Sequence, residues 1–260
     1  MEHLTELELT KLLDTNIKTF EFTDEDRKQF TSNFNYYRNR YENIEWNSEL
    51  AYLYTNMEKK LKRYPRWLEY CKKYCEISWE HCKKYELDEV EQKMMKHDIA
   101  WRASRTWIGL TVEQVLKLQL LSWGYDIVAH EFIDVAMGVD IVAIDNKGKL
   151  TYIHVTKNTD GALNKINKKE KKVAGNGFKR DFSNHLILSY DIEESEKNIM
   201  VGALPVFKKE YVLEQLKTVK CTETVQENRL TELAYFYRNR VNKDGRFKFK
   251  SKKGLKFSYE

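Results

Sequence analysis

The sequence predicts an α/β protein in which a helical N-terminal region precedes a mixed sheet. Apolar residues recur at helical spacing through about the first hundred residues, as in Phe30, Phe34 and Tyr37. From residue 111 the pattern changes to alternating helices and strands. With 260 residues, of which 42% are hydrophobic, the chain can bury a substantial core.

The N-terminal region is expected to contain several helices. The first begins at residues 23–26, where a threonine and three acids form a favourable helix start. A second helix fits residues 48–63, and Pro65 marks a break after it. A third fits residues 66–85, and a fourth runs from about residue 88 towards residue 105.

The rest of the chain is expected to alternate between helices and strands. A helix is predicted at residues 111–123 and is closed by Gly124. An amphipathic, lysine-rich helix is predicted at residues 160–174, and further helices at residues 208–219 and 222–240. Strands are predicted at residues 125–133, 139–145, 149–156, 185–190 and 200–206.

The final twenty residues predict a hairpin in which aromatic and basic residues alternate, so that one face is apolar and the other cationic. The net charge of +5 is only a small excess, but the basic residues are concentrated in this tail and in residues 160–174. Such clusters suit phosphate contact with salt-sensitive affinity, and a solvated face is the alternative. The candidate nucleic-acid contacts are Lys165, Lys168, Lys169, Lys172, Arg238, Arg240, Arg246, Lys248 and Lys250.

From the sequence we expect neither a membrane-spanning protein, nor a protein with a signal peptide, nor a disulfide-rich protein. No run approaches the roughly 18 apolar residues of a membrane span, and residues 1–14 lack a signal-peptide pattern. Four cysteines in a chain of this length predict no disulfide framework, so a cytoplasmic setting without a membrane is expected. Cys71 and Cys82 would lie about 16 Å apart along one helix, which is too far for one zinc ion.

Four polar residues near the predicted sheet could support chemistry: Glu113, Asp140, His154 and Lys157. An aspartate at the start of one strand lies beside the middle of its hairpin partner. Phosphodiester hydrolysis requires an activated water and neutralised phosphate charge, which Mg²⁺ held by carboxylates can supply. A nearby lysine can orient the water.

The order helix, strand, strand, strand, helix, strand resembles the PD-(D/E)xK nuclease superfamily over about residues 108–190. The stretch Gly138-Val139-Asp140-Ile141-Val142-Ala143 is similar to the G-[VFI]-D-[IVL]-[IVL]-A pattern of that group. The resemblance implies a restriction-endonuclease-like αβββαβ core with a mixed central sheet. The expected organisation is a helical region at 1–107, the core at 108–220, and a helix with a basic hairpin at 221–260.

The resemblance also implies roles for the four residues. Asp140 would bind Mg²⁺ or Mn²⁺, and Glu113 would assist it directly or through water. Two registers remain open for the E-x-K motif. If Lys157 is the family lysine, the acid position falls on Val155; if His154 takes the acid position, the lysine position falls on Thr156. The expected roles are His154 in the acid position and Lys157 orienting the attacking water.

The function implied by the resemblance is a metal-dependent DNA endonuclease that hydrolyses phosphodiester bonds, with a restriction-type enzyme as the first subtype by analogy. The alternative is a catalytically inactive nuclease-fold protein that acts as a nucleic-acid-binding module, which the missing acid predicts. The sequence leaves open whether two chains pair as a homodimer.

Overall fold

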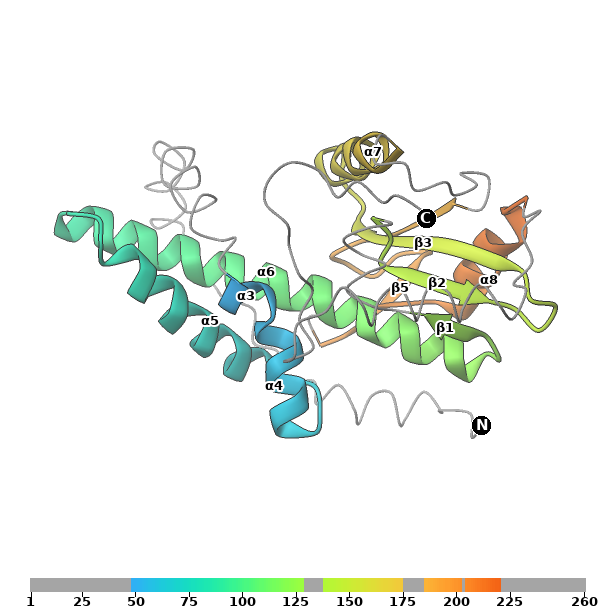
Figure 1. The fold of residues 1–260 in the computed structure, drawn as a ribbon, viewed down its shortest axis with the longest axis horizontal. Coiled ribbons are helices and arrows are strands. Elements are labelled where there is room, and N and C mark those ends of the chain that lie inside the picture. The colour runs from blue at the N-terminus through green and yellow to red at the C-terminus, as the bar shows by residue number, and fades with distance from the viewer. Residues whose placement is uncertain (1–47, 129–137, 175–184, 203, 221–260) are drawn as a thin grey trace, which may run out of the picture. The chain divides into compact units, whose positions relative to one another are not determined.

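The computed structural model describes residues 48–128, 138–174, 185–202 and 204–220. These residues form helices and a mixed sheet, as the sequence predicts (Figure 1). The first predicted helix, the helix at 222–240 and the basic hairpin lie outside the described residues. The same holds for five of the predicted contacts, Arg238, Arg240, Arg246, Lys248 and Lys250.

The contacts divide the chain into two compact units. The boundary falls between Val112 and Glu113, with the short segment Val201–Leu204 grouped with the first unit. The predicted boundary lay five residues earlier, before Ile108. Both positions fall inside one continuous helix, α6 (Glu89–Ser122), so the change of unit does not coincide with a change of secondary structure.

The first unit is helical. It contains α3 (Ser48–Ala51), α4 (Leu53–Leu61), α5 (Trp67–Cys82) and the N-terminal part of α6. The single helix predicted at 48–63 is therefore divided at Tyr52, whose backbone leaves the helical region. Lys62 then ends α4 in the left-handed conformation, with its N–H bonded to the carbonyl of Glu58.

The predicted break between residues 105 and 111 does not occur, because α6 continues through it for 34 residues. Its buried positions keep helical spacing across this stretch, as Ala103, Trp107 and Thr111 show. The helix ends where predicted, at Gly124, which adopts a φ of +88°. The amide of Tyr125 donates to the carbonyl of Leu120 at 3.0 Å, as in a Schellman cap.

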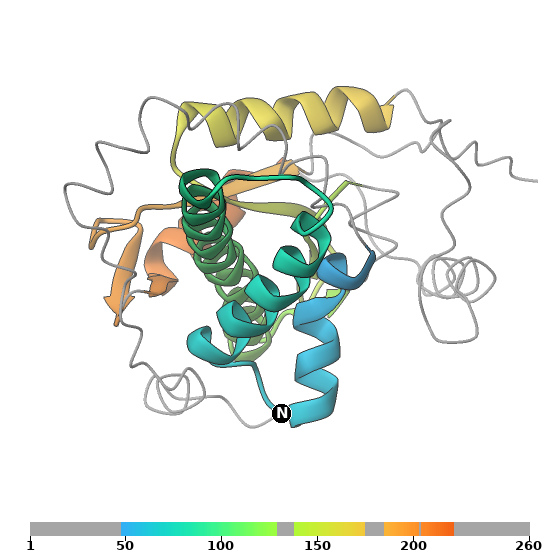
Figure 2. The same cartoon turned by 90° about the vertical axis from the view of Figure 1, so that its left-hand side faces the viewer.

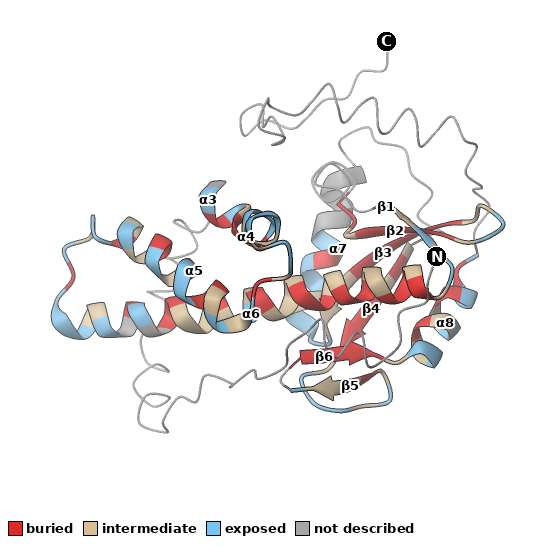
Figure 3. Ribbon diagram, turned by 90° about the horizontal axis from the view of Figure 1, so that it is seen from below, coloured by how far each residue is buried: buried red, intermediate tan, exposed pale blue. Residues whose placement is uncertain are grey.

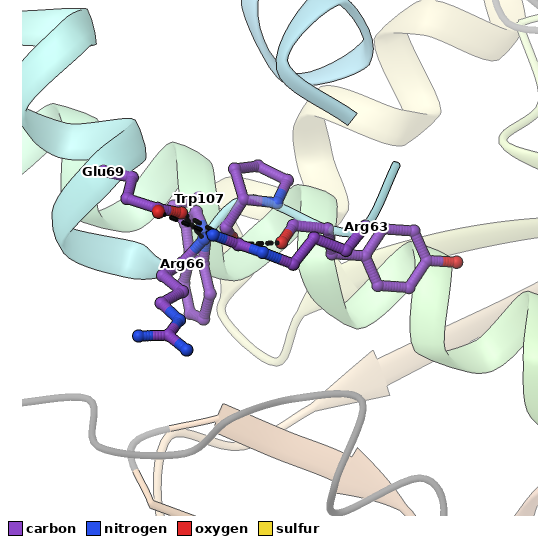
Figure 4. Close-up of polar contacts among 6 residues, drawn as sticks. Arg63, Arg66, Glu69 and Trp107 are labelled. Atoms are coloured by element: carbon purple, nitrogen blue, oxygen red, sulfur yellow. Dashed lines mark hydrogen bonds and ion pairs between the residues drawn. The ribbon is translucent and has the colours of Figure 1, made fainter. Parts of the chain in front are cut away.

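The turn between α4 and α5 is held by paired polar groups (Figure 4). The Arg63 guanidinium donates to both carboxylate oxygens of Glu69, at 2.9 and 2.7 Å. The same carboxylate accepts the backbone N–H of Arg66 at 2.9 Å, which caps α5. Trp107 Nε1 donates to the carbonyl of Pro65 at 2.8 Å, so this turn is fixed to α6 as well.

The second unit contains a four-stranded sheet with the order β1-β2-β3-β4. Its strands are β1 (Asp126–Val128), β2 (Ile141–Ile144), β3 (Leu150–Lys157) and β4 (His185–Tyr190). The first three are antiparallel neighbours, whereas β3 and β4 are parallel. A parallel pair requires a crossover connection, and α7 (Asp160–Ala174) lies within it.

The predicted strand at 200–206 is wrong as a single element. It forms two strands, β5 (Asn198–Val201) and β6 (Leu204–Phe207), which make a separate two-stranded sheet. Gly202, between them, adopts a φ of +63°, a conformation that favours glycine and turns the chain. Helix α8 (Lys209–Thr218) follows directly.

Helices flank the four-stranded sheet. The part of α6 that belongs to this unit lies across one face, and α7 lies on the opposite side (Figures 1 and 2). The buried residues gather in the central strands and on α6 (Figure 3); Ile141, Ile153 and Leu188 have no exposed surface. None of the described helices combines the length and apolar composition that a membrane crossing requires.

Candidate functional site

Asp140 lies immediately before β2 and is joined to β3 through both its backbone and its side chain. Its N–H donates to the carbonyl of Ile153 at 3.1 Å. Its Oδ2 accepts the N–H of Val155 at 2.8 Å. The carboxylate is 18% exposed. Asp140 therefore stands at the start of a strand, and one of its oxygens already satisfies a backbone donor.

His154 lies next to this carboxylate. Its Nδ1 is 3.9 Å from Asp140 Oδ2, which is longer than a hydrogen bond, and the side chain is only 1% exposed. A second imidazole packs against it: the ring centroids of His154 and His185 are 4.9 Å apart, with the planes tilted by 55°. The structure thus brings together one carboxylate and two histidines.

The pairing of β3 indicates which residues share a face. Side chains alternate along a strand, so Tyr152, His154 and Thr156 lie on one face and Lys157 on the other. Pairing with β4 continues without interruption to Lys157 opposite Tyr190, so no bulge on that side reverses the alternation. His154, whose imidazole lies beside the Asp140 carboxylate, therefore shares its face of β3 with Thr156 and not with Lys157.

Glu113 sits within α6, and its carboxylate forms an ion pair with Lys117 one turn later, at 2.6 Å. Both side chains are largely buried. The helix predicted at 111–123 would place Glu113 in its first turn, but α6 begins at Glu89, so Glu113 lies in the interior of a helix. The ion pair gives this carboxylate a partner on its own helix.

The described residues beside Asp140 offer imidazole nitrogens rather than further carboxylates. Mg²⁺ favours octahedral coordination by oxygen atoms, including carboxylates, whereas histidine nitrogen suits softer metals. Here Asp140 contributes a single carboxylate, already bonded to an amide. No group of three His, Cys, Asp or Glu residues in the described part of the chain could hold a metal ion.

The cysteines of α5 serve packing. Cys71 and Cys82 are buried, and burial raises the pKa of Cys71 to about 12 and that of Cys82 to about 11. Burial likewise raises the pKa of Cys75 to about 11. At neutral pH these thiols are protonated, and a protonated thiol is a poor metal ligand.

Of the predicted nucleic-acid contacts, Lys165 and Lys168 are described completely, and both are exposed on α7. Neither forms an ion pair with another residue that the structure describes. Lys169 and Lys172 also belong to α7, but their side chains lie outside the described residues.

Two neighbours of this site were missed from the sequence. His185 had been assigned only to a strand, and its approach to His154 depends on the β3–β4 register. Lys197 Nζ lies 3.4 Å from the hydroxyl of Ser189, which pairs with Thr156. The available signal was the presence of polar residues, such as Ser189, within otherwise apolar strands.

Comparison with protein-family models, with curated proteins and with solved structures finds no match for this chain.

Proposed function

We propose that this protein binds nucleic acid through an α/β unit arranged like that of a nuclease. It does not use a magnesium site to cleave the nucleic acid that it binds. The observation that carries this proposal is the residue beside Asp140. Where the resemblance requires an acid, the chain has His154, almost completely buried. A buried imidazole provides neither a negative charge nor an oxygen ligand for a hard divalent ion such as Mg²⁺.

Nucleic acid is the proposed partner for two reasons. The element order from α6 to β4 is helix, strand, strand, strand, helix, strand, the order on which the nuclease resemblance rests. The helix after β3 also presents exposed lysines, Lys165 and Lys168. Lysines of this kind bind phosphate through charge, with an affinity that falls as salt rises.

A metal-dependent DNA endonuclease is the second candidate function. One observation favours it: the Asp140 carboxylate stands at the start of β2, partly exposed, beside the strand that would complete the site. Mn²⁺ accepts nitrogen ligands more readily than Mg²⁺ does. Cleavage supported by Mn²⁺ but not Mg²⁺ would therefore favour this candidate.

One experiment separates the two candidates. The purified protein is incubated with supercoiled plasmid in Mg²⁺, Mn²⁺ or EDTA, and its binding to the same DNA is measured at two salt concentrations. The proposal predicts salt-sensitive binding and no nicking in any condition. Nicking that requires metal and is lost in Asp140→Ala would instead establish the endonuclease. An absence of DNA binding at low salt would refute both.

A further inference from the structure

The outer face of α7 carries a regular arrangement of polar side chains. We define this face as Asn164, Lys165, Asn167 and Lys168, all of which are exposed. The two asparagines are three residues apart, and so are the two lysines, so each pair forms a row along the helix. Ile166, between them in sequence, is buried and anchors the opposite side of the helix.

The lysines of this face have no acidic residue three or four positions away on α7. The positions three and four residues from Lys165 are Gly161, Ala162, Lys168 and Lys169. Those around Lys168 are Asn164, Lys165, Lys171 and Lys172. Like charges at these spacings destabilise a helix, so the arrangement weakens α7 in isolation.

Two exposed lysines on or next to α5 have acidic partners on the same helix. On α5, Lys73 pairs with Glu76 at 3.0 Å. Lys83, which follows that helix directly, pairs with Glu80 at 2.6 Å. Each of these lysines meets an acid three residues away. Lys165 and Lys168 have no acid three or four residues away, so no pairing of this kind along the helix offsets their charge.

The asparagines of this face also disfavour the helix. Asparagine favours helices less than glutamate, glutamine or lysine does, because its side chain competes with the backbone for hydrogen bonds. The two asparagines, and the two lysines that have no acid three or four residues away, thus each lower the stability of the helix. Both residue types suit a polyanion: lysine neutralises phosphate, and an amide bonds to phosphate oxygens or base edges.

We propose that the outer face of α7 docks on the backbone of duplex DNA, with Lys165 and Lys168 each neutralising one phosphate. The two lysines are about 4.5 Å apart along the helix axis. The flexible lysine side chains allow both ammonium groups to reach phosphates of one strand. Asn164 and Asn167 bond to groups beside those phosphates. This inference rests on the proposed function, since it names the surface that makes the contact.

The test measures the affinity of the full chain for a labelled DNA duplex across a range of salt concentrations. Each phosphate contact contributes about 0.9 to the slope of log affinity against log salt. The double variant Lys165→Gln/Lys168→Gln should therefore lower the slope by about 1.8. Asn164→Ala/Asn167→Ala should weaken binding and leave the slope unchanged, because no charge is removed.

The matched control is Lys73→Gln/Lys83→Gln, which removes two exposed lysines that have acidic partners. It should change neither the affinity nor the slope. If the α7 lysine variant behaves like this control while the wild type binds, the inference about α7 is wrong and the proposed function stands. If the wild type shows no salt-sensitive binding, the proposed function itself fails. Thermal melting confirms that each variant is folded.

Discussion

Charged and polar groups have different roles in the turn before α5 and at the end of the sheet near Asp140. In the turn, Glu69 accepts two hydrogen bonds from Arg63 and one from Arg66, and Trp107 bonds to Pro65. At the sheet, Asp140 accepts the N–H of Val155 and lies 3.9 Å from His154, and α7, which follows β3, carries Lys165 and Lys168 with no acid three or four residues away. The first arrangement stabilises the fold, whereas the exposed lysines of α7 are the groups that we propose contact a partner.

The largest expected effect comes from Trp107, which is only 2% exposed. Trp107→Ala removes its hydrogen bond to Pro65 and leaves a cavity in the helical unit. We expect the free energy of unfolding to fall by about 3–5 kcal/mol, measured by urea denaturation. Trp107→Phe keeps most of the volume and should cost about 1–3 kcal/mol, the penalty for leaving the Pro65 carbonyl unsatisfied. Equal losses in both variants would show that the hydrogen bond, not packing, dominates.

A smaller effect is expected at Asp140. Asp140→Ala leaves the amide of Val155 without its carboxylate partner, so we expect a loss of about 1–2 kcal/mol in unfolding free energy. Asp140→Asn retains an oxygen acceptor and should lose less. DNA affinity should stay within twofold of wild type in Asp140→Asn, because the proposal assigns binding to α7. A large loss of affinity with unchanged stability would place Asp140 in the binding surface instead.

The smallest effect concerns Glu69. Hydrogen bonds from Arg63 lower the pKa of its carboxyl below the usual value, and partial burial opposes this. A lowered folded-state pKa stabilises the fold above the ordinary carboxyl pKa, and that contribution disappears as pH falls through the folded-state pKa. Because the pair is exposed to solvent, Glu69→Gln should cost only about 0.5 kcal/mol at pH 7. The difference between variant and wild type should shrink as pH falls below the ordinary carboxyl pKa and through the lowered pKa of Glu69, as measured by chemical denaturation; a constant difference would exclude the ionic contribution.

Parts of the fold were predictable because their signal is local. The bounds of α7 and β4 match the predicted ranges, since amphipathic spacing and a run of apolar residues specify them. The continuity of α6 was missed because residues 105–111, including Gly109, resemble a break, and only the buried positions on both sides show otherwise. The division of residues 200–206 into two strands depends on the conformation of Gly202.

The candidate site was harder to predict because it depends on pairing between distant segments. The place of Asp140 beside β3 follows from a short hairpin and could be anticipated. The contact between His154 and His185 joins β3 and β4, which are separated in sequence by the whole α7 crossover. The local sequence of either strand does not determine how the two strands pair. For the same reason, the choice between Lys157 and Thr156 in the lysine position required the strand pairing.

We propose that the four-stranded sheet lacks a magnesium site because position 154 carries histidine and position 156 carries threonine. The most direct measurement compares plasmid nicking in Mg²⁺ by the wild type and by His154→Glu/Thr156→Lys. The variant has a glutamate and a lysine in the positions of the E-x-K motif that the resemblance implies, so it supplies the missing carboxylate. We expect no nicking by the wild type and Mg²⁺-dependent nicking by the variant, which should be abolished when Asp140→Asn is added to it. Mg²⁺-dependent nicking by the wild type itself, lost in Asp140→Asn, would contradict the proposed absence of a magnesium site.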